Sequence, residues 1–207
     1  MVIGIKVERM DSLKNIAEQV RNCKRCELHK NRTNAVPGEG PKRSDVMLIG
    51  EAPGYNEDQQ GRPFVGDAGD VLEGLLEKAN LSRGDVYIAN IIKCRPPENR
   101  DPKKGEIKEC TAYLKRQIKL IEPKLIVSLG RVSARELLGR SVKVSKEHGA
   151  LIDLDYSGWY CKAFISYHPA AALYGADTEI KLERDFKKLG EIVKNLDSFN
   201  TSRQTTL

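Results

Sequence analysis

Asp45-Val46-Met47-Leu48-Ile49, followed directly by Gly50-Glu51-Ala52-Pro53-Gly54, is the stretch that decides the fold. The apolar run predicts a buried strand, and the glycines and the proline predict an irregular turn at its carboxyl end. In an open α/β sheet, ligands bind at the carboxyl ends of the strands. Glu51 supplies a carboxylate there, and Phe64, in the next glycine-flanked segment, offers a ring on which a flat polar ligand would stack.

The glycine-rich turn does not match the common phosphate-binding loops. It has no Gly-Lys-Ser/Thr ending and no Gly-x-Gly-x-x-Gly pattern, and Pro53 removes a backbone donor. An ordinary turn between a strand and a helix is the alternative, because clusters of glycine and proline are the usual punctuation between elements.

The rest of the chain alternates apolar runs with segments of helical spacing. This alternation predicts an α/β fold: a single domain with a central, mainly parallel four-stranded sheet flanked by helices on both faces. Asp11 is the expected N-cap of the first helix, and Asp67 or Asp70 that of the second. The strands are expected over 45–50, 86–89, 125–129 and 160–166, and the helices over 12–20, 71–79, 104–121, 132–138 and 178–195.

The 207 residues are expected to form one domain over 10–196, preceded by an N-terminal appendage, 1–9, and followed by a flexible tail, 197–207. The chain has no run of about 18 apolar residues and no signal segment, so we expect no membrane association and a cytoplasmic location. The net charge of +6 is compatible with a polyanionic partner, and hence with a place at the nucleoid. Many basic proteins bind no nucleic acid, and the Lys/Glu-rich composition equally fits a thermophilic source.

The five cysteines of such a chain are better interpreted as metal ligands or free thiols than as disulfides. Cys23 and Cys26 form a Cys-x-x-Cys pair, and Cys94 and Cys110 form a second pair. Four thiolates suit tetrahedral zinc or an iron–sulfur cluster equally well. A thioredoxin-like redox pair is a weaker interpretation, because the preceding strand and a tryptophan are missing. Cys161 lies in a strand-like run and is expected to be a small buried side chain.

Several polar residues follow directly on the predicted strands. Taken singly, Asn90 is explained as a strand cap and His168, before a proline, as a structural residue. Parallel strands bring their carboxyl ends to one edge, however, so these residues should meet. The residues gathered there are Gly50–Gly54, Asn90, Ser128–Gly130 and His168.

This set resembles the uracil-DNA glycosylase superfamily, and within it the iron–sulfur family 4 enzymes of thermophilic archaea and bacteria. The similarity runs from about Met10 to Leu196. It implies that the metal is a [4Fe–4S] cluster held by Cys23, Cys26, Cys94 and Cys110. The motifs that carry it are Gly50-Glu51-Ala52-Pro53-Gly54, Gly61-Arg62-Pro63-Phe64-Val65-Gly66, Asn90 ahead of Lys93-Cys94-Arg95-Pro96-Pro97, and His168-Pro169-Ala170-Ala171.

The resemblance implies an enzyme that flips uracil out of single- or double-stranded DNA and hydrolyses its N-glycosidic bond, the first step of base-excision repair. Phe64 would stack on the pyrimidine, and the Asn90 amide would pair with O4 and N3–H, which rejects cytosine. A neutral His168 would donate a hydrogen bond to O2 as uracil leaves with negative charge. Backbone N–H groups near Gly50, Glu51 and Ala52 would add to this.

Ala52 departs from the best-known family of the superfamily, which has a water-positioning Asp there and a Tyr in place of Gly54. Family 4 shares this departure. Glu51 is then the carboxylate left to orient water or to hold the cationic sugar, which makes Glu51 and His168 the expected catalytic residues.

Contacts to DNA are expected from Arg131, on phosphate, and from Leu173 or Tyr174, as a wedge in the vacated stack. Ordinary surface positions are the alternative. The tail Gln204-Thr205-Thr206-Leu207 resembles the start of a sliding-clamp-binding peptide. The protein is expected to be a monomer. A non-catalytic nucleic-acid-binding iron–sulfur protein of the same fold is the alternative function.

Overall fold

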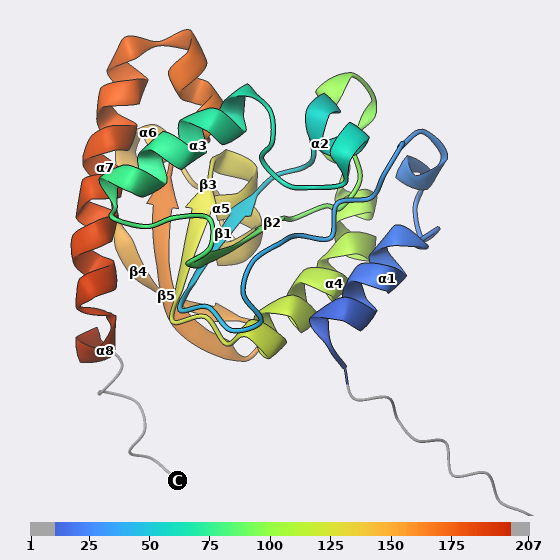
Figure 1. The fold of residues 1–207 in the computed structure, drawn as a ribbon, viewed down its shortest axis with the longest axis horizontal. Helices are drawn as coiled ribbons and strands as arrows, with labels where there is room; N and C mark the ends of the chain where they lie inside the picture. The colour runs from blue at the N-terminus through green and yellow to red at the C-terminus, as the bar shows by residue number, and fades with distance from the viewer. Residues whose placement is uncertain (1–10, 200–207) are drawn as a thin grey trace, which may run out of the picture.

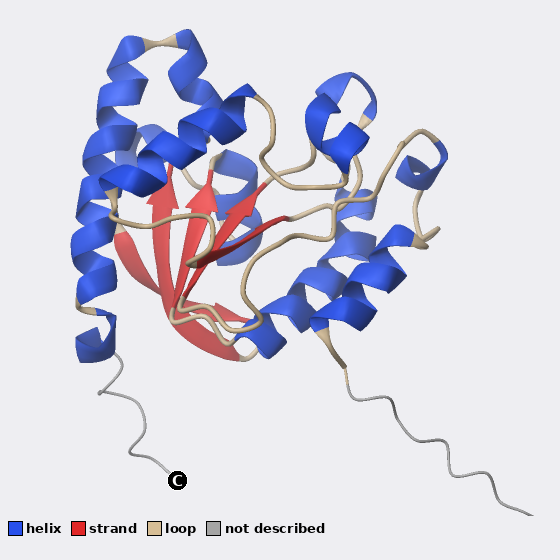
Figure 2. Cartoon of the chain, in the orientation of Figure 1, coloured by secondary structure: helices blue, strands red, loops and turns tan. Residues whose placement is uncertain are grey.

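A computed structural model describes residues 11–199 of the chain. At its centre is a five-stranded sheet with the strand order β2-β1-β3-β5-β4 (Figure 2). Four strands are parallel, and β4 runs antiparallel to β5 at one edge. The strands are β1 (Val46–Gly50), β2 (Val86–Asn90), β3 (Leu125–Leu129), β4 (Leu151–Tyr156) and β5 (Trp159–Ser166).

The α/β class and the mainly parallel sheet are confirmed, but the prediction of four strands missed β4. Leu154 and Tyr156 of this strand are buried, whereas Asp153 of the same strand is exposed. Ser157 and Gly158 join β4 to β5 with φ angles of 56° and 83°, the two positive values that a tight type I′ hairpin needs. The strand β4 was missed because two aspartates in its six residues interrupt the apolar pattern by which the other strands were predicted.

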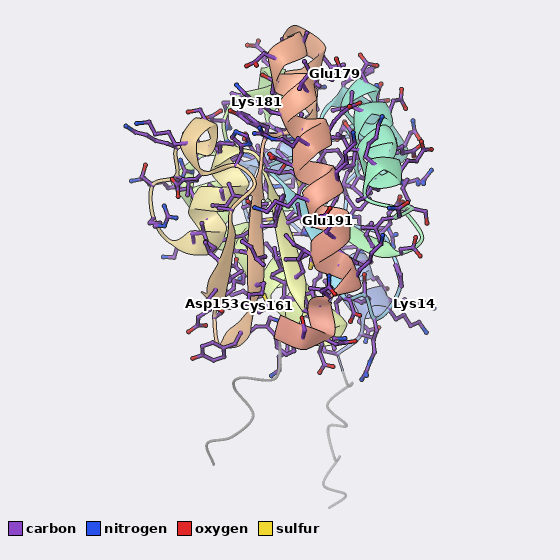
Figure 3. All side chains as sticks on the ribbon, turned by 90° about the vertical axis from the view of Figure 1, so that its left-hand side faces the viewer. Lys14, Asp153, Cys161, Glu179, Lys181 and Glu191 are labelled. Atoms are coloured by element: carbon purple, nitrogen blue, oxygen red, sulfur yellow. The ribbon has the colours of Figure 1, made fainter. Side chains whose placement is uncertain are left out.

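Helices cover both faces of the sheet, as the alternation predicted. The helices α3 (Asp67–Lys78) and α7 (Ala176–Lys194) pack on one face, at the left of Figure 1. The other face is covered by α1 (Leu13–Arg21), α4 (Lys104–Ile121) and α5 (Arg131–Leu138). Alternate residues of β1 enter the two cores, with Leu48 on the first face and Ile49 on the second. The outer side of α7 carries charged residues such as Glu179 and Glu191 (Figure 3).

Two helix starts differ from the expected ones. The N-cap of α1 is Ser12, whose hydroxyl accepts the Asn15 N–H at 3.1 Å, and Asp11 instead binds Arg116. Gly66 takes the N-cap position of α3, so that Asp67 and Asp70 lie in the first turn, where carboxylates favour the helix dipole. The short helices are η1 (Glu27–Lys30), α2 (Tyr55–Gln60), η2 (Pro97–Asn99), α6 (Val144–Glu147), η3 (Pro169–Tyr174) and α8 (Leu196–Phe199).

The expected appendage 1–9 and the residues 200–207 of the expected tail lie outside the described part of the chain. The first residues of that tail, 197–199, belong instead to α8, where Asp197 accepts a hydrogen bond from Lys124 at 2.7 Å. Within residues 11–199, no helix has the length and apolar character needed to cross a membrane.

Candidate active site

A cleft of about 480 Å³ opens where the parallel strands end. Five side chains expected to bind the ligand line it: Glu51 and Ala52 after β1, Phe64, Asn90 at the end of β2, and His168 after β5. These residues are up to 117 positions apart in the chain, from Glu51 to His168. The sheet brings them together because its four parallel strands end at the same edge.

Gly50 lies beneath the cleft and lets two of its walls approach each other. It is paired in register with Asn90 on the neighbouring strand. A Cβ atom on Gly50 would overlap with the Asn90 side-chain oxygen and would lie 2.8 Å from Cζ of Phe64. Glycine is therefore required by close approach, whatever its backbone angles.

Asn90 carries a buried acceptor that the protein does not satisfy. Its Oδ1 atom has no hydrogen-bond partner among the described residues, although the residue is almost fully buried. Such a group costs free energy unless a ligand pairs with it, so it points to a bound N–H donor. The backbone of Asn90 is fixed, because its carbonyl accepts from Lys93 Nζ at 2.9 Å. Lys93 also donates to Gln117 at 2.8 Å, and burial lowers the pKa of Lys93 to about 8.

His168 is prepared to act as a neutral donor. Its Nδ1 atom accepts the Ala170 backbone N–H at 3.2 Å, so the proton of the neutral ring lies on Nε2. Burial lowers the pKa of His168 to about 4. The ring stacks on Phe64 with centroids 5.5 Å apart and an interplanar angle of 27°. Gly130 packs beneath it, where a Cβ atom would lie 3.0 Å from that of His168.

Phe64 has a positive φ of 51°, and the surrounding structure holds this conformation. Arg83 donates to the carbonyl groups of Phe64 at 2.8 Å and Pro63 at 2.7 Å. On the other side of Phe64, the Glu57 carboxylate accepts the N–H groups of Val65 and Gly66 at 2.8 and 3.1 Å. The same carboxylate accepts the Gly54 N–H at 3.0 Å and so joins both halves of the glycine-rich motif.

Glu51 lies half-buried in the cleft. Burial raises the pKa of its carboxyl group, nearby Asp101 adds to this, and Arg131 and Arg135 oppose it. No ion pair to this carboxylate is found among residues 11–199. It is therefore available to a cationic or hydrogen-bonding ligand.

The four predicted ligand cysteines line a second, narrow cavity between α1, η1, the loop after β2, and α4. Burial raises the pKa of Cys94 and, to about 12, that of Cys110, so a bound cation would be needed to ionise them. Two groups already donate to the sulfurs: Arg32 to Cys94 at 3.0 Å and the Lys93 backbone to Cys110 at 3.2 Å. Within the described chain, no three side chains surround the position of a single metal ion.

Cys161 lies outside this cavity. It is buried in the first part of β5, opposite Leu154 (Figure 3). The expectation of a small buried side chain is confirmed.

Comparison with known proteins agrees with this geometry. Residues 37–194 match the model of the Uracil DNA glycosylase superfamily. The chain belongs to this superfamily. A Type-4 uracil-DNA glycosylase of Sulfurisphaera tokodaii is 47% identical over 188 residues, covering 88% of this chain and 86% of the relative. The Type-4 enzymes of Saccharolobus solfataricus and Thermotoga maritima are 46% and 38% identical, over 92% and 90% of this chain and 92% and 97% of theirs. The resemblance to family 4 is confirmed.

The residues expected to touch DNA occupy different places in this superfamily member. Leu173, on η3, lines the cleft and is 46% exposed. Tyr174 is 89% exposed but does not line the cleft. Arg131, the first residue of α5, is exposed, does not line the cleft, and pairs with Asp101 at 2.9 Å. Ser128, which was expected at the same edge, is instead buried in the sheet, where its hydroxyl donates to Phe164 at 3.3 Å.

Sequence reasoning missed the outer wall of the cleft. This wall consists of α2 and of the loop around η2, and the sequence signals for it are a glycine followed three residues later by Glu57, and the repeated prolines. It also missed Arg83, which lies 19 residues beyond Phe64 in the sequence and donates a hydrogen bond to its carbonyl group. Pro53 and Gly54, expected at this edge, also line the cleft, and the additional lining residues are Tyr55, Asn56, Glu57, Gly66, Asp67, Ala68, Pro96, Asn99, Arg100 and Ala170.

Proposed function

We propose that this protein is a monofunctional uracil-DNA glycosylase, which hydrolyses the N-glycosidic bond of uracil in DNA and leaves an abasic site. The observation that carries the proposal is the unpartnered Oδ1 of Asn90, buried beside the stacked pair of Phe64 and His168. A pyrimidine with a ring N–H next to a carbonyl group satisfies this oxygen. The names of the curated relatives support the same activity.

The base would be recognised by its edge and its face. Asn90 accepts from uracil N3–H and donates its amide N–H to O4, while Phe64 covers the ring. Cytosine presents an acceptor at N3 and a donor at C4. The Asn90 amide packs closely against Gly50. Against cytosine, both the N–H and the oxygen of this amide would stay unpaired in a buried site, which weakens the binding of cytosine relative to uracil.

Cleavage breaks the bond between C1′ and N1, and the electron pair leaves with uracil. His168 donates from Nε2 to O2, where the negative charge develops, and remains neutral because its pKa lies at about 4. The Glu51 carboxylate would stabilise the cationic sugar and orient the water that adds to C1′. The water proton leaves to solvent or to this carboxylate.

We propose that Cys23, Cys26, Cys94 and Cys110 hold a [4Fe–4S] cluster. The four thiols share one cavity, and the match to Type-4 uracil-DNA glycosylases supports the family for which the resemblance implies this cluster. Arg25, Arg32 and Lys93 line the same cavity and would offset its negative charge. When bound, the cluster would serve as a cross-link between α1, the loop after β2, and α4.

DNA in single- or double-stranded form is the expected substrate. Leu173 is the better placed of the two wedge candidates, because it lines the cleft and Tyr174 does not. Arg131 would reach phosphate by exchanging its exposed ion pair with Asp101. We further propose that the protein acts as a monomer at the cytoplasmic nucleoid; the segment 204–207, which resembles the start of a clamp-binding peptide, lies outside the described residues.

Incubation with a uracil-containing oligonucleotide, followed by alkali, tests the function directly. Strand scission at uracil is expected, and its absence would refute the activity in favour of a non-catalytic DNA-binding protein. Asn90→Ala and His168→Ala are each expected to lower kcat/KM by at least about 100-fold, since each removes a transition-state contact. Both variants should keep the absorption of the cluster. Full activity of either one would contradict the site assignment.

A further inference from the structure

The cleft is larger than the base proposed to occupy its floor. Its volume of about 480 Å³ is in the range that holds drug-sized ligands, and one pyrimidine fills only part of it. Tyr55, the first residue of α2, lines the cleft and has no role in the uracil pocket described above. It is 58% exposed, an unusual position for a large aromatic side chain.

Arg95 supports one face of the Tyr55 ring. The guanidinium carbon of Arg95 lies 5.2 Å from the ring centroid, a cation–π arrangement. Arg95 is itself held, because its Nε atom donates to Asn99 Oδ1 at 2.8 Å, and Asn99 also lines the cleft. The high exposure of Tyr55 leaves its second face open. A flat group could therefore stack there without first ordering the side chain.

The charge of Arg95 is also available. Two other arginines near the cleft have carboxylate partners: Arg100 pairs with Glu106, and Arg131 pairs with Asp101. Among residues 11–199, no carboxylate pairs with Arg95, whose one described polar contact is the neutral Asn99. An anionic group beside the Tyr55 ring would meet an uncompensated positive charge.

We propose that Tyr55 and Arg95 form a nucleotide subsite next to the uracil pocket. The base of the nucleotide adjacent to the uridine, in the same strand, stacks on the open face of Tyr55, and Arg95 lies near its phosphate. Extruding uracil removes a stacking partner from this neighbouring base, and the Tyr55 ring replaces it. Stacking of this kind tolerates any base, because every base has a flat face. The inference rests on the proposed function, since it places the substrate by its uracil.

The test compares four variants on three single-stranded oligonucleotides. One has normal bases around uracil, one lacks the base on the 5′ side, and one lacks it on the 3′ side, with an abasic analogue in each case. Tyr55→Ala and Tyr55→Leu are expected to lower kcat/KM on the normal strand about 5- to 100-fold. Tyr55→Phe keeps the ring and should stay within about twofold of the wild type. Tyr160→Ala removes a tyrosine of similar exposure, 63%, from the distant hairpin and serves as the control.

On one of the two base-deficient strands, the wild type and Tyr55→Ala should cleave equally well. The proposal is overturned if Tyr55→Ala matches the wild type on the normal strand. It is also overturned if the loss is the same on all three strands, because Tyr55 would then shape the uracil pocket itself. Failure of the proposed function gives a different result: the wild type would release uracil from none of the three.

Discussion

At the scale of single residues, His168 shows how burial selects one protonation state. The Ala170 N–H occupies Nδ1 and Phe64 stacks on the ring, and the burial of the ring outweighs the nearby Glu57 carboxylate, which alone would favour the charged imidazolium. A neutral ring with its proton on Nε2 is the form that can donate to a leaving oxyanion without first transferring a proton. The same burial makes the fold sensitive to acid.

We expect folding stability to fall as the pH decreases from 6.5 to about 4. Unfolded His168 binds a proton near pH 6.5 and folded His168 only near pH 4, so within this range the unfolded state binds more protons. Above pH 6.5 the free energy of unfolding is unaffected by His168, and by pH 4 it has fallen by an amount on the order of 3 kcal/mol. Thermal unfolding at pH 7 and pH 4.5 measures it. His168→Gln should lose less stability on acidification than the wild type, and equal losses would contradict the assignment.

The types of the site residues could be predicted from the sequence, but the contacts that orient them could not. Asn90 and His168 were predicted because residues at strand ends must meet at one sheet edge, and Phe64 because it lies in the glycine-flanked segment that follows Gly50–Gly54. Arg83 and Glu57 escaped, since their hydrogen bonds to the Phe64 loop depend on how α2 and α3 pack. Nothing in the local sequence around either residue indicates which distant carbonyl or N–H group it binds.

At the scale of elements, the site depends on two parallel strands that end in register. Gly50 ends β1 and Asn90 ends β2, and the two are partners in the ladder. Asn90 delivers its side chain to the cleft, and the absence of a side chain on Gly50 sets how closely Asn90 and Phe64 approach the end of β1. The Asn90 amide and the Phe64 ring share the space that a Cβ atom would occupy.

Gly50→Ala is therefore expected to displace Asn90 and Phe64. The added Cβ overlaps with Asn90 Oδ1, and overpacking of this kind costs about 1–3 kcal/mol. We expect kcat/KM for uracil excision to fall at least about tenfold, with a lower melting temperature. Gly74→Ala on α3 is the matched control, because no atom lies within 4 Å of its added Cβ and alanine favours a helix by about 0.5–1 kcal/mol. If both variants behaved alike, close approach at Gly50 would not explain the glycine.

The elements that sequence reasoning missed are those without a continuous apolar pattern. The edge strand β4 buries only one face, and its alternation is short. α2 is a single short helix that begins at a glycine, so hydrophobic periodicity has too few residues to reveal it. The strands β1, β2 and β3, in contrast, are buried on both faces and show as nearly continuous apolar runs.

At the scale of the whole molecule, the cysteine cavity connects the N-terminal helix to the floor of the cleft. The helices α1 and α4 lie side by side (Figure 1). Cys23 and Cys26 follow α1, Cys110 lies on α4, and Cys94 is four residues beyond Asn90. Lys93 lies between the two sites and binds the Asn90 carbonyl. Loss of the group held by the cysteines should therefore loosen both α1 and the backbone that presents Asn90.

Cys110→Ser tests this connection. Cys161→Ser is the control, because it changes a cysteine that lies outside the cavity. Removing one of four thiolates should abolish the broad absorption near about 400 nm that a [4Fe–4S] cluster gives. Because the metal group contributes directly to folding free energy, the melting temperature should fall by about 10 °C or more. Activity should fall with the melting temperature, because Lys93 links the cavity to the Asn90 backbone.

Cys161 lies on β5, away from the cavity, so its variant should keep the colour and lose only the stability that a small buried side chain contributes. If Cys110→Ser kept both its colour and its melting temperature, the cavity would not be the cofactor site. If Cys161→Ser lost the colour instead, the ligand set would be wrong.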